Sequence, residues 1–188
     1  MSYVIYIVIL VVVVIVLIAI YFLTTYNKLV TLRNKVRNQK SQIDVELKRR
    51  FDLIPNLVET VKGYAEHEKS ALEDVIKARN AYATAGNDTA RALEADNALT
   101  GVLGRLFALS ESYPQLMANT NFISLQKELS NTEQKIVYSR QFYNDAVYRL
   151  NTKIEMFPSN LAAAMFGFSH EAFFEAKDSE RENVKVSF

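Results

Sequence analysis

One uninterrupted apolar run at the start of the chain sets the strongest limit on what this sequence can fold into. The run covers residues 3–23 and contains no charged residue, no proline and no glycine. At about 1.5 Å of rise per residue, a helix of that length crosses the roughly 30 Å hydrocarbon core of a bilayer. A buried strand needs only about 4–8 apolar residues, and a soluble helix carries a polar face. We therefore expect residues 1–26 to form a transmembrane anchor.

A cleaved signal peptide is the alternative interpretation of this run. Such a peptide has a basic start, an apolar core of about 7–15 residues and small residues at its cleavage site. No Lys or Arg precedes the run, the run is longer than that core, and Ala19 stands alone among bulky neighbours. The chain has no cysteine, which excludes lipoprotein processing. These observations favour an uncleaved anchor.

The charge next to the run predicts its orientation. Residues 28–50 carry eight basic and two acidic side chains, whereas residues 51–188 carry fourteen basic and nineteen acidic ones. Lys and Arg close to a transmembrane end stay in the cytoplasm, so we expect the N-terminus outside and the body inside. Anionic lipid is the expected partner of the basic segment, because no nucleic-acid-binding module accompanies it. The expected residues of the two membrane interfaces are Tyr3, Tyr21, Tyr26 and Lys28.

Beyond the anchor, apolar side chains repeat every seven residues and predict long helices that face one another. One repeat consists of Leu29, Val36, Ile43, Arg50, Leu57 and Tyr64. The other consists of Phe122, Leu129, Ile136, Tyr143, Leu150 and Phe157. The predicted fold class is all-α, with the transmembrane helix followed by an elongated antiparallel bundle of three to four long helices over residues 27–157.

Prolines and polar loops predict where these helices end. We expect one helix to end at Asp52 or Leu53 and the next to carry Pro55 in its first turn, which would kink the rod. The polar loop at residues 83–89 separates two further helices, and Pro158 closes the last one. The expected N-caps are Asp88 or Thr89 and Asn119 or Asn121.

Residues 158–188 form a tail that is rich in phenylalanine. Its candidate partner-binding residues are Phe166, Phe168, Phe173, Phe174, Val184, Val186 and Phe188. Two interpretations stay open, a lid packed on the end of the bundle and an exposed patch that a partner or a second copy covers. The last three residues fit the pattern that a PDZ-like sheet edge captures. A terminus that docks on its own bundle or hangs free is the alternative.

Several blocks of the chain resemble the LemA family. The most specific is Leu-Lys-Arg-Arg-Phe-Asp-Leu-Ile-Pro-Asn-Leu at residues 47–57. Further matches are residues 32–38, Glu68, Ala78, Arg79, Tyr113, Pro114, Thr132, Glu133, Arg140, Tyr143, Asn144, Asn151, Phe157 and Pro158. The resemblance implies a bacterial inner-membrane protein with one N-terminal helix, a long helical bundle and a poorly defined role. Some members of the family are tied to magnetosome membranes and others to membrane-embedded zinc proteases, and the family pattern supplies no catalytic residues.

The sequence contains no constellation of catalytic or metal-binding residues. With no cysteine, thiolate nucleophiles and thiolate metal sites are excluded. His67 and Glu68 open like a zincin motif, but Ala71 stands where the second histidine belongs. His170 lacks the glutamate three residues earlier that di-iron bundles use. We expect both histidines at the surface, no cofactor and no enzyme.

Polar residues inside the apolar repeats predict a buried network. Arg50 occupies an apolar position of its repeat, and an unpaired buried charge costs several kcal/mol. We expect Arg50 to join Asp44, Glu133, Arg140 and Asn144 in a network that fixes the register of the helices. A polar docking site for a partner is the alternative.

Three functions are compatible with these features. The first is a membrane-tethered scaffold or adaptor that presents its bundle and apolar tail to a protein partner, such as a membrane protease or a PDZ-like module. The second is self-association that organises or remodels the membrane, although the apolar run has no Gly-x-x-x-Gly motif for tight packing. The third is a small-molecule site between helices, to which no convergent polar cluster points.

Overall fold

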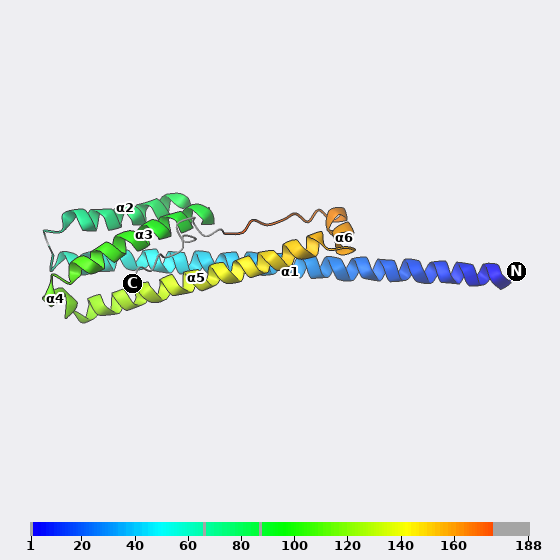
Figure 1. Cartoon of the computed structure of the whole chain (residues 1–188), viewed down its shortest axis with the longest axis horizontal. Coiled ribbons are helices and arrows are strands. Elements are labelled where there is room, and N and C mark those ends of the chain that lie inside the picture. The colour runs from blue at the N-terminus through cyan, green and yellow to red at the C-terminus, as the bar shows by residue number, and fades with distance from the viewer. Residues whose placement is uncertain (1, 66, 87, 175–188) are drawn as a thin grey trace, which may run out of the picture. The chain divides into compact units, whose positions relative to one another are not determined.

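Every regular element in the described part of the chain is a helix (Figure 1). The computed structural model describes residues 2–65, 67–86 and 88–174. Its helices are α1 (Ser2–Lys62), α2 (Lys69–Ala85), α3 (Thr89–Ser110), α4 (Pro114–Met117), α5 (Thr120–Glu155) and α6 (Ser159–Met165). The predicted all-α class and the long apolar N-terminal helix are confirmed.

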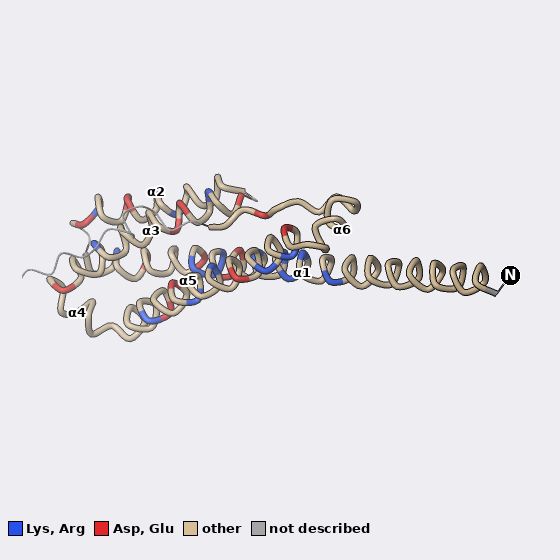
Figure 2. The backbone as a smooth tube through the Cα atoms, turned by 45° about the vertical axis from the view of Figure 1, so that its right-hand side comes forward, with Lys and Arg blue, Asp and Glu red and all other residues tan. Residues whose placement is uncertain are grey.

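The first part of α1 is long and apolar enough to cross a bilayer. Its most apolar window has a mean hydropathy of 3.5, and every side chain from residue 3 to residue 20 is exposed. The basic side chains of α1 begin beyond this run, at Lys28 (Figure 2). Exposed apolar surface of this extent is unfavourable in water, and a bilayer supplies the apolar surroundings that it lacks.

The expected helix end before Pro55 is wrong, because α1 continues through Pro55 to Lys62. A proline inside a helix removes the hydrogen bond to the carbonyl four residues earlier and costs about 3 kcal/mol. The side chains around it are buried, with Ile54 and Leu57 fully enclosed. Burial of one such aliphatic side chain contributes about 1.5–3 kcal/mol, so packing on both sides of Pro55 outweighs the local penalty.

The chain divides into two compact units. One unit joins residues 1–39 to residues 142–188, and the other consists of residues 40–141. Both α1 and α5 contribute a segment to each unit.

The unit of residues 40–141 has an aliphatic core to which α1, α2, α3 and α5 all contribute. Its fully enclosed side chains include Ile43, Leu47, Val75, Leu99, Leu106, Leu129 and Ile136. Helix α2 packs against α3, and the rings of Phe51 and Tyr82 stack with centroids 4.0 Å apart. Two expected N-caps are confirmed, since Asp88 accepts hydrogen bonds from the backbone of α3 and Asn119 accepts one from the backbone of α5.

The other unit packs the start of the basic segment against the end of α5 and α6. Its buried apolar side chains include Leu29, Val36, Tyr143, Ala146, Val147, Leu150, Ile154, Ala162 and Ala163. The seven-residue repeat is wrong at its last position, because Phe157 is 78% exposed. Phe157 lies beyond Glu155, where α5 ends, and so leaves the helical stripe. In the unit of residues 40–141, Tyr64 is exposed for the same reason, since α1 ends at Lys62.

Candidate functional site

The C-terminal strap, which we define as residues 168–174, is held on α5 by two asparagine side chains. The carboxamide of Asn151 donates to the carbonyl of Glu171 (2.9 Å) and accepts from its N–H (3.0 Å). Asn144 does the same with Phe174, at 2.9 Å in both directions. A carboxamide has the donor and the acceptor of a peptide unit, so each asparagine pairs with the strap as a neighbouring strand would.

The spacing of the two asparagines matches the spacing of the strap residues that they bind. Asn144 and Asn151 are seven residues apart, which is nearly two helical turns and about 10.5 Å of rise. Glu171 and Phe174 are three residues apart, which is about 10 Å in an extended chain. One face of α5 can therefore hold an extended segment at two points without strain in either partner. We call the two asparagines the backbone clamp.

Side chains add a second layer of contacts around the backbone clamp. The hydroxyl of Tyr143 donates to the carbonyl of Ala172 (3.0 Å), and its ring lies 4.5 Å from that of Phe174. Burial raises the pKa of the Tyr143 hydroxyl, and the nearby carboxylate of Glu171 raises it further, so the hydroxyl stays a donor at neutral pH. His170 lies 2.9 Å from the carboxylate of Glu155.

The aromatic residues that precede or begin the strap contact the anchor helix. The ring of Tyr26 lies 4.9 Å from that of Phe166 and 6.0 Å from that of Phe168. The guanidinium of Arg33 lies over the ring of Phe168, 4.9 Å from its centre.

The expected tail residues divide into three groups. Phe168 and Phe174 are half-buried against these partners, whereas Phe166 and Phe173 keep exposed rings. Val184, Val186 and Phe188 lie outside the described residues.

The predicted polar network is present in part and has a member that the sequence reasoning missed. Arg50 is 1% exposed, and its guanidinium lies 2.6 Å from the carboxylate of Asp96 and 3.3 Å from that of Glu133. Burial raises the pKa of the Asp96 carboxyl, and Arg50 opposes part of that rise. Asp96 lies three residues after Leu93 and three before Leu99 on the buried stripe of α3. A lone acid on a leucine stripe was the signal that could have revealed it.

The other expected members of the network have different surroundings. Asp44 accepts a hydrogen bond from the hydroxyl of Thr89 (2.9 Å), at the first turn of α3. Arg140 acts on Asp96 through its charge, which lowers the pKa of that carboxyl less than Arg50 does. Asn144 belongs to the backbone clamp. The clamp itself was missed, although asparagines seven residues apart on a helix were its visible signal.

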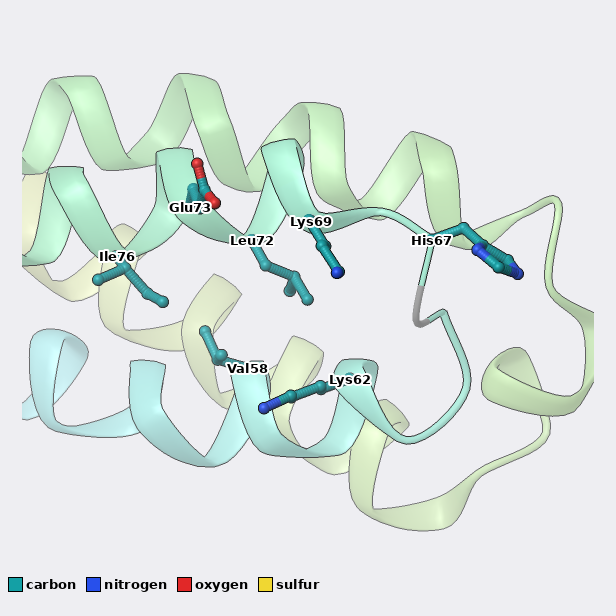
Figure 3. Close-up of a pocket in the computed structure, with 7 residues that line it drawn as sticks. All are labelled: Val58, Lys62, His67, Lys69, Leu72, Glu73 and Ile76. Atoms are coloured by element: carbon teal, nitrogen blue, oxygen red, sulfur yellow. The ribbon is translucent and has the colours of Figure 1, made fainter.

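A shallow pocket of about 600 Å³ lies between the end of α1 and the start of α2 (Figure 3). Val58, Leu72 and Ile76 form its apolar floor, and the chains of Lys62 and Lys69 reach along it. His67 is exposed at its edge. No group of three or more His, Asp or Glu that could hold a metal ion occurs in the described ranges. The pocket therefore has an amphipathic lining, to which Glu73 adds an acidic side chain.

The expected membrane-interface residues all lie on α1. Tyr3 is exposed at the start of the apolar run, and Tyr21 is half-buried near its end. Tyr26 contacts Phe166, and Lys28 is exposed.

Comparisons of the sequence with known proteins point to one family. The sequence model of the LemA family matches residues 39–188. Protein LemA of Metamycoplasma hominis is 26% identical over 161 residues, which cover 86% of this chain and 74% of that protein. Magnetosome protein MamQ 2 of Paramagnetospirillum magneticum is 28% identical over 180 residues, which cover 82% of this chain and 66% of that protein. Magnetosome protein MamQ of Magnetospirillum gryphiswaldense is 26% identical over 185 residues, or 83% of this chain and 68% of that protein.

Proposed function

The chain belongs to the LemA family, and we propose that it is a non-enzymatic, membrane-anchored adaptor that holds extended segments of partner proteins on α5. The single observation that carries this proposal is the backbone clamp. Asn144 and Asn151 bind main-chain N–H and C=O groups, which every extended segment offers at the same spacing. In this proposal the C-terminal strap occupies the site until a partner segment replaces it.

The proposed setting is the inner membrane of a bacterium. The apolar run of α1 spans the bilayer once, and the net positive charge of residues 28–50 keeps the body in the cytoplasm. The helices over residues 27–157 form an antiparallel bundle of three to four helices that supports the clamp. A membrane protease or a PDZ-like module remains the expected kind of partner.

A peptide-binding experiment tests the adaptor proposal. The probe is a labelled peptide with the sequence of residues 168–174, Phe-Ser-His-Glu-Ala-Phe-Phe. The full chain is placed in lipid nanodiscs with Glu171→Pro, which removes the strap N–H that Asn151 accepts and so opens the site. We expect this chain to bind the peptide more tightly than the unaltered chain, whose own strap competes for the site.

Two controls show whether the main chain is what α5 recognises. Adding Asn144→Ala and Asn151→Ala should abolish binding, whereas adding Asn131→Ala, an exposed residue of the same helix, should not. A peptide N-methylated at its Glu and its last Phe loses both donors and should not bind. Equal binding of the methylated peptide would show that side chains carry the recognition. Absence of peptide binding to the Glu171→Pro chain would contradict the adaptor proposal and assign the strap a structural role alone.

Self-assembly on the membrane is the second candidate function. Its support is the similarity to proteins named as magnetosome proteins, together with the exposed apolar side chains of α1 and of the segment around α6. A single monomeric species of the full chain in mild detergent, under conditions that preserve its helices, would remove this candidate.

A further inference from the structure

The segment around α6 exposes large apolar side chains on one side and packs small ones on the other. Phe157 is 78% exposed, Leu161 53% and Met165 66%. On the opposite side, Ala162 and Ala163 are fully buried. Leu161 and Met165 are four residues apart and share one face of α6, and Phe157 is exposed in the turn between the end of α5 and the start of α6. Exposure of these apolar side chains to water is unfavourable in free energy.

Contacts with the anchor helix place this stripe at a defined level along α1. The ring of Phe166, next to the end of α6, lies 4.9 Å from that of Tyr26. Tyr26 lies three residues after Leu23, where the apolar run ends, which is about 4.5 Å along a helix. Both views show α6 beside α1, and the first basic residues of α1 are coloured at this level in Figure 2 (Figures 1 and 2). The stripe is therefore level with the place where the anchor leaves the hydrocarbon.

The charges around α6 suit an anionic lipid surface. Lys28 is the first basic residue after the apolar run, and Arg33 lies against Phe168, the first residue of the strap. A basic residue near an anionic bilayer surface is attracted to its headgroups. The acid closest to α6 along α5, Glu155, is paired with His170.

From this placement we infer that Phe157, Leu161 and Met165 form an interfacial foot, which inserts into the leaflet that the anchor helix crosses. Aromatic and aliphatic side chains on one face of a short helix enter the boundary between headgroups and acyl chains, while the opposite face stays on the protein. The foot gives the chain a second contact with the lipid beside the anchor. This inference rests on the proposed membrane anchor.

The chain has no native cysteine, so a single reporter can be attached at any position. The full chain is labelled with an environment-sensitive fluorophore at Leu161→Cys, at Val13→Cys in the middle of the apolar run, or at Tyr148→Cys on an exposed part of α5. Each protein enters nanodiscs of phosphatidylcholine and phosphatidylglycerol that hold one chain apiece. Quenching is measured with nitroxide lipids and with aqueous iodide.

We expect nitroxide lipids to quench positions 13 and 161 strongly and position 148 little. A nitroxide near the carbonyl end of the acyl chain should quench position 161 more than one near the chain end, and the order should reverse at position 13. Quenching of position 161 by iodide alone would overturn the foot and leave the anchor standing. Absence of lipid quenching at position 13 would overturn the anchor itself. Protection of position 161 from both quenchers would assign the stripe to a protein contact and overturn the lipid inference.

A second set of variants separates insertion from folding. With the reporter at Phe157→Cys, the double substitution Leu161→Asp and Met165→Asp places two carboxylates on the stripe, and nitroxide quenching should be lost. Both side chains are exposed, so the helix content of the chain should not change. Val45→Asp, at an exposed aliphatic residue of the other unit, is the matched control and should keep the quenching. Unchanged quenching in the double variant would contradict the foot.

Discussion

Asn151 and Glu171, twenty residues apart in the chain, exchange a reciprocal pair of hydrogen bonds between a side-chain carboxamide and the main chain. Asn151 is buried and lies one residue after Leu150 of the apolar repeat on α5. A buried amide must find partners for its polar groups, and the strap supplies both of them. At Glu171 the strap is therefore held through its backbone.

Asn151→Ala should free the strap locally without unfolding α5. Two hydrogen bonds contribute together about 1–3 kcal/mol, so amide exchange at Glu171 should rise by a factor between about five and about one hundred. Hydrogen exchange read by mass spectrometry on the full chain in detergent checks this. Asn131→Ala on the exposed side of α5 should leave the strap unchanged. An unaltered exchange rate at Glu171 in Asn151→Ala would show that other contacts hold the strap.

Arg50→Met should lower the stability of the unit of residues 40–141 by about 3–5 kcal/mol, because it leaves the buried carboxylate of Asp96 without its partner. The double variant Arg50→Met and Asp96→Leu should recover most of that loss, since an apolar pair replaces the buried ion pair. Thermal unfolding in mild detergent measures both. Equal melting of the single variant and the unaltered chain would contradict a stabilising network.

The same variant should have a characteristic pH dependence. Burial already raises the pKa of the Asp96 carboxyl, and removal of the Arg50 charge raises it further. A carboxyl with a higher pKa in the folded state than in the unfolded state binds its proton more readily when folded, so stability falls as the pH rises between the two values. The deficit of Arg50→Met should therefore shrink from about pH 7 toward the ordinary aspartate pKa of about 3.9. A deficit that grows on acidification would contradict this assignment.

Tyr143→Phe should protect the strap at alkaline pH. The pKa of Tyr143 is raised by burial and by Glu171, so the folded state keeps the hydroxyl proton longer than the unfolded state does. Stability then falls as the pH rises above the ordinary tyrosine pKa of about 10. Tyr143→Phe loses one hydrogen bond at neutral pH. Above about pH 10 its stability should fall less than that of the unaltered chain. Tyr148→Phe, at an exposed ring of α5, serves as the control in the same melting series.

Gly167→Ala and Gly101→Ala should have opposite effects. Gly167 precedes the strap with φ +69°, a conformation that costs an alanine about 1–2 kcal/mol, and no neighbouring atom crowds the added methyl group. Gly101 lies inside α3 with open space around it, so alanine there should stabilise the helix by about 1 kcal/mol. Melting temperatures of the two variants test this pair. A destabilising Gly101→Ala would point to a contact on that face of α3.

Periodicity predicted the helices well because burial follows it closely. The apolar repeats identified the buried stripes of α1 and α5 and placed Arg50 inside one of them. The repeat did not predict the helix through Pro55. The free-energy cost of the proline is local, whereas the side-chain burial that offsets it depends on packing against other segments. It also did not select Asp96 over Asp44 as the partner of Arg50, since the choice depends on how α3 packs.

The backbone clamp left only a weak signal in the sequence, for a different reason. Main-chain recognition leaves no trace in the side chains of residues 171 and 174, so only the asparagines on α5 carry a signal. Two asparagines seven residues apart are common on solvated helices. The spacing becomes informative only in the structure, where the rise between the two asparagines matches the length of the extended chain between residues 171 and 174.

The contact between Tyr26 and Phe166 joins the anchor to the segment that leads into the strap, and both belong to one compact unit with the backbone clamp. In the proposed setting, a polypeptide bound to α5 would therefore lie at a fixed distance from the bilayer surface. The clamp would then select partner segments by their distance from the membrane. Segments that directly follow the transmembrane helix of a neighbouring membrane protein would bind the clamp. The same sequence placed farther from the membrane would not bind it.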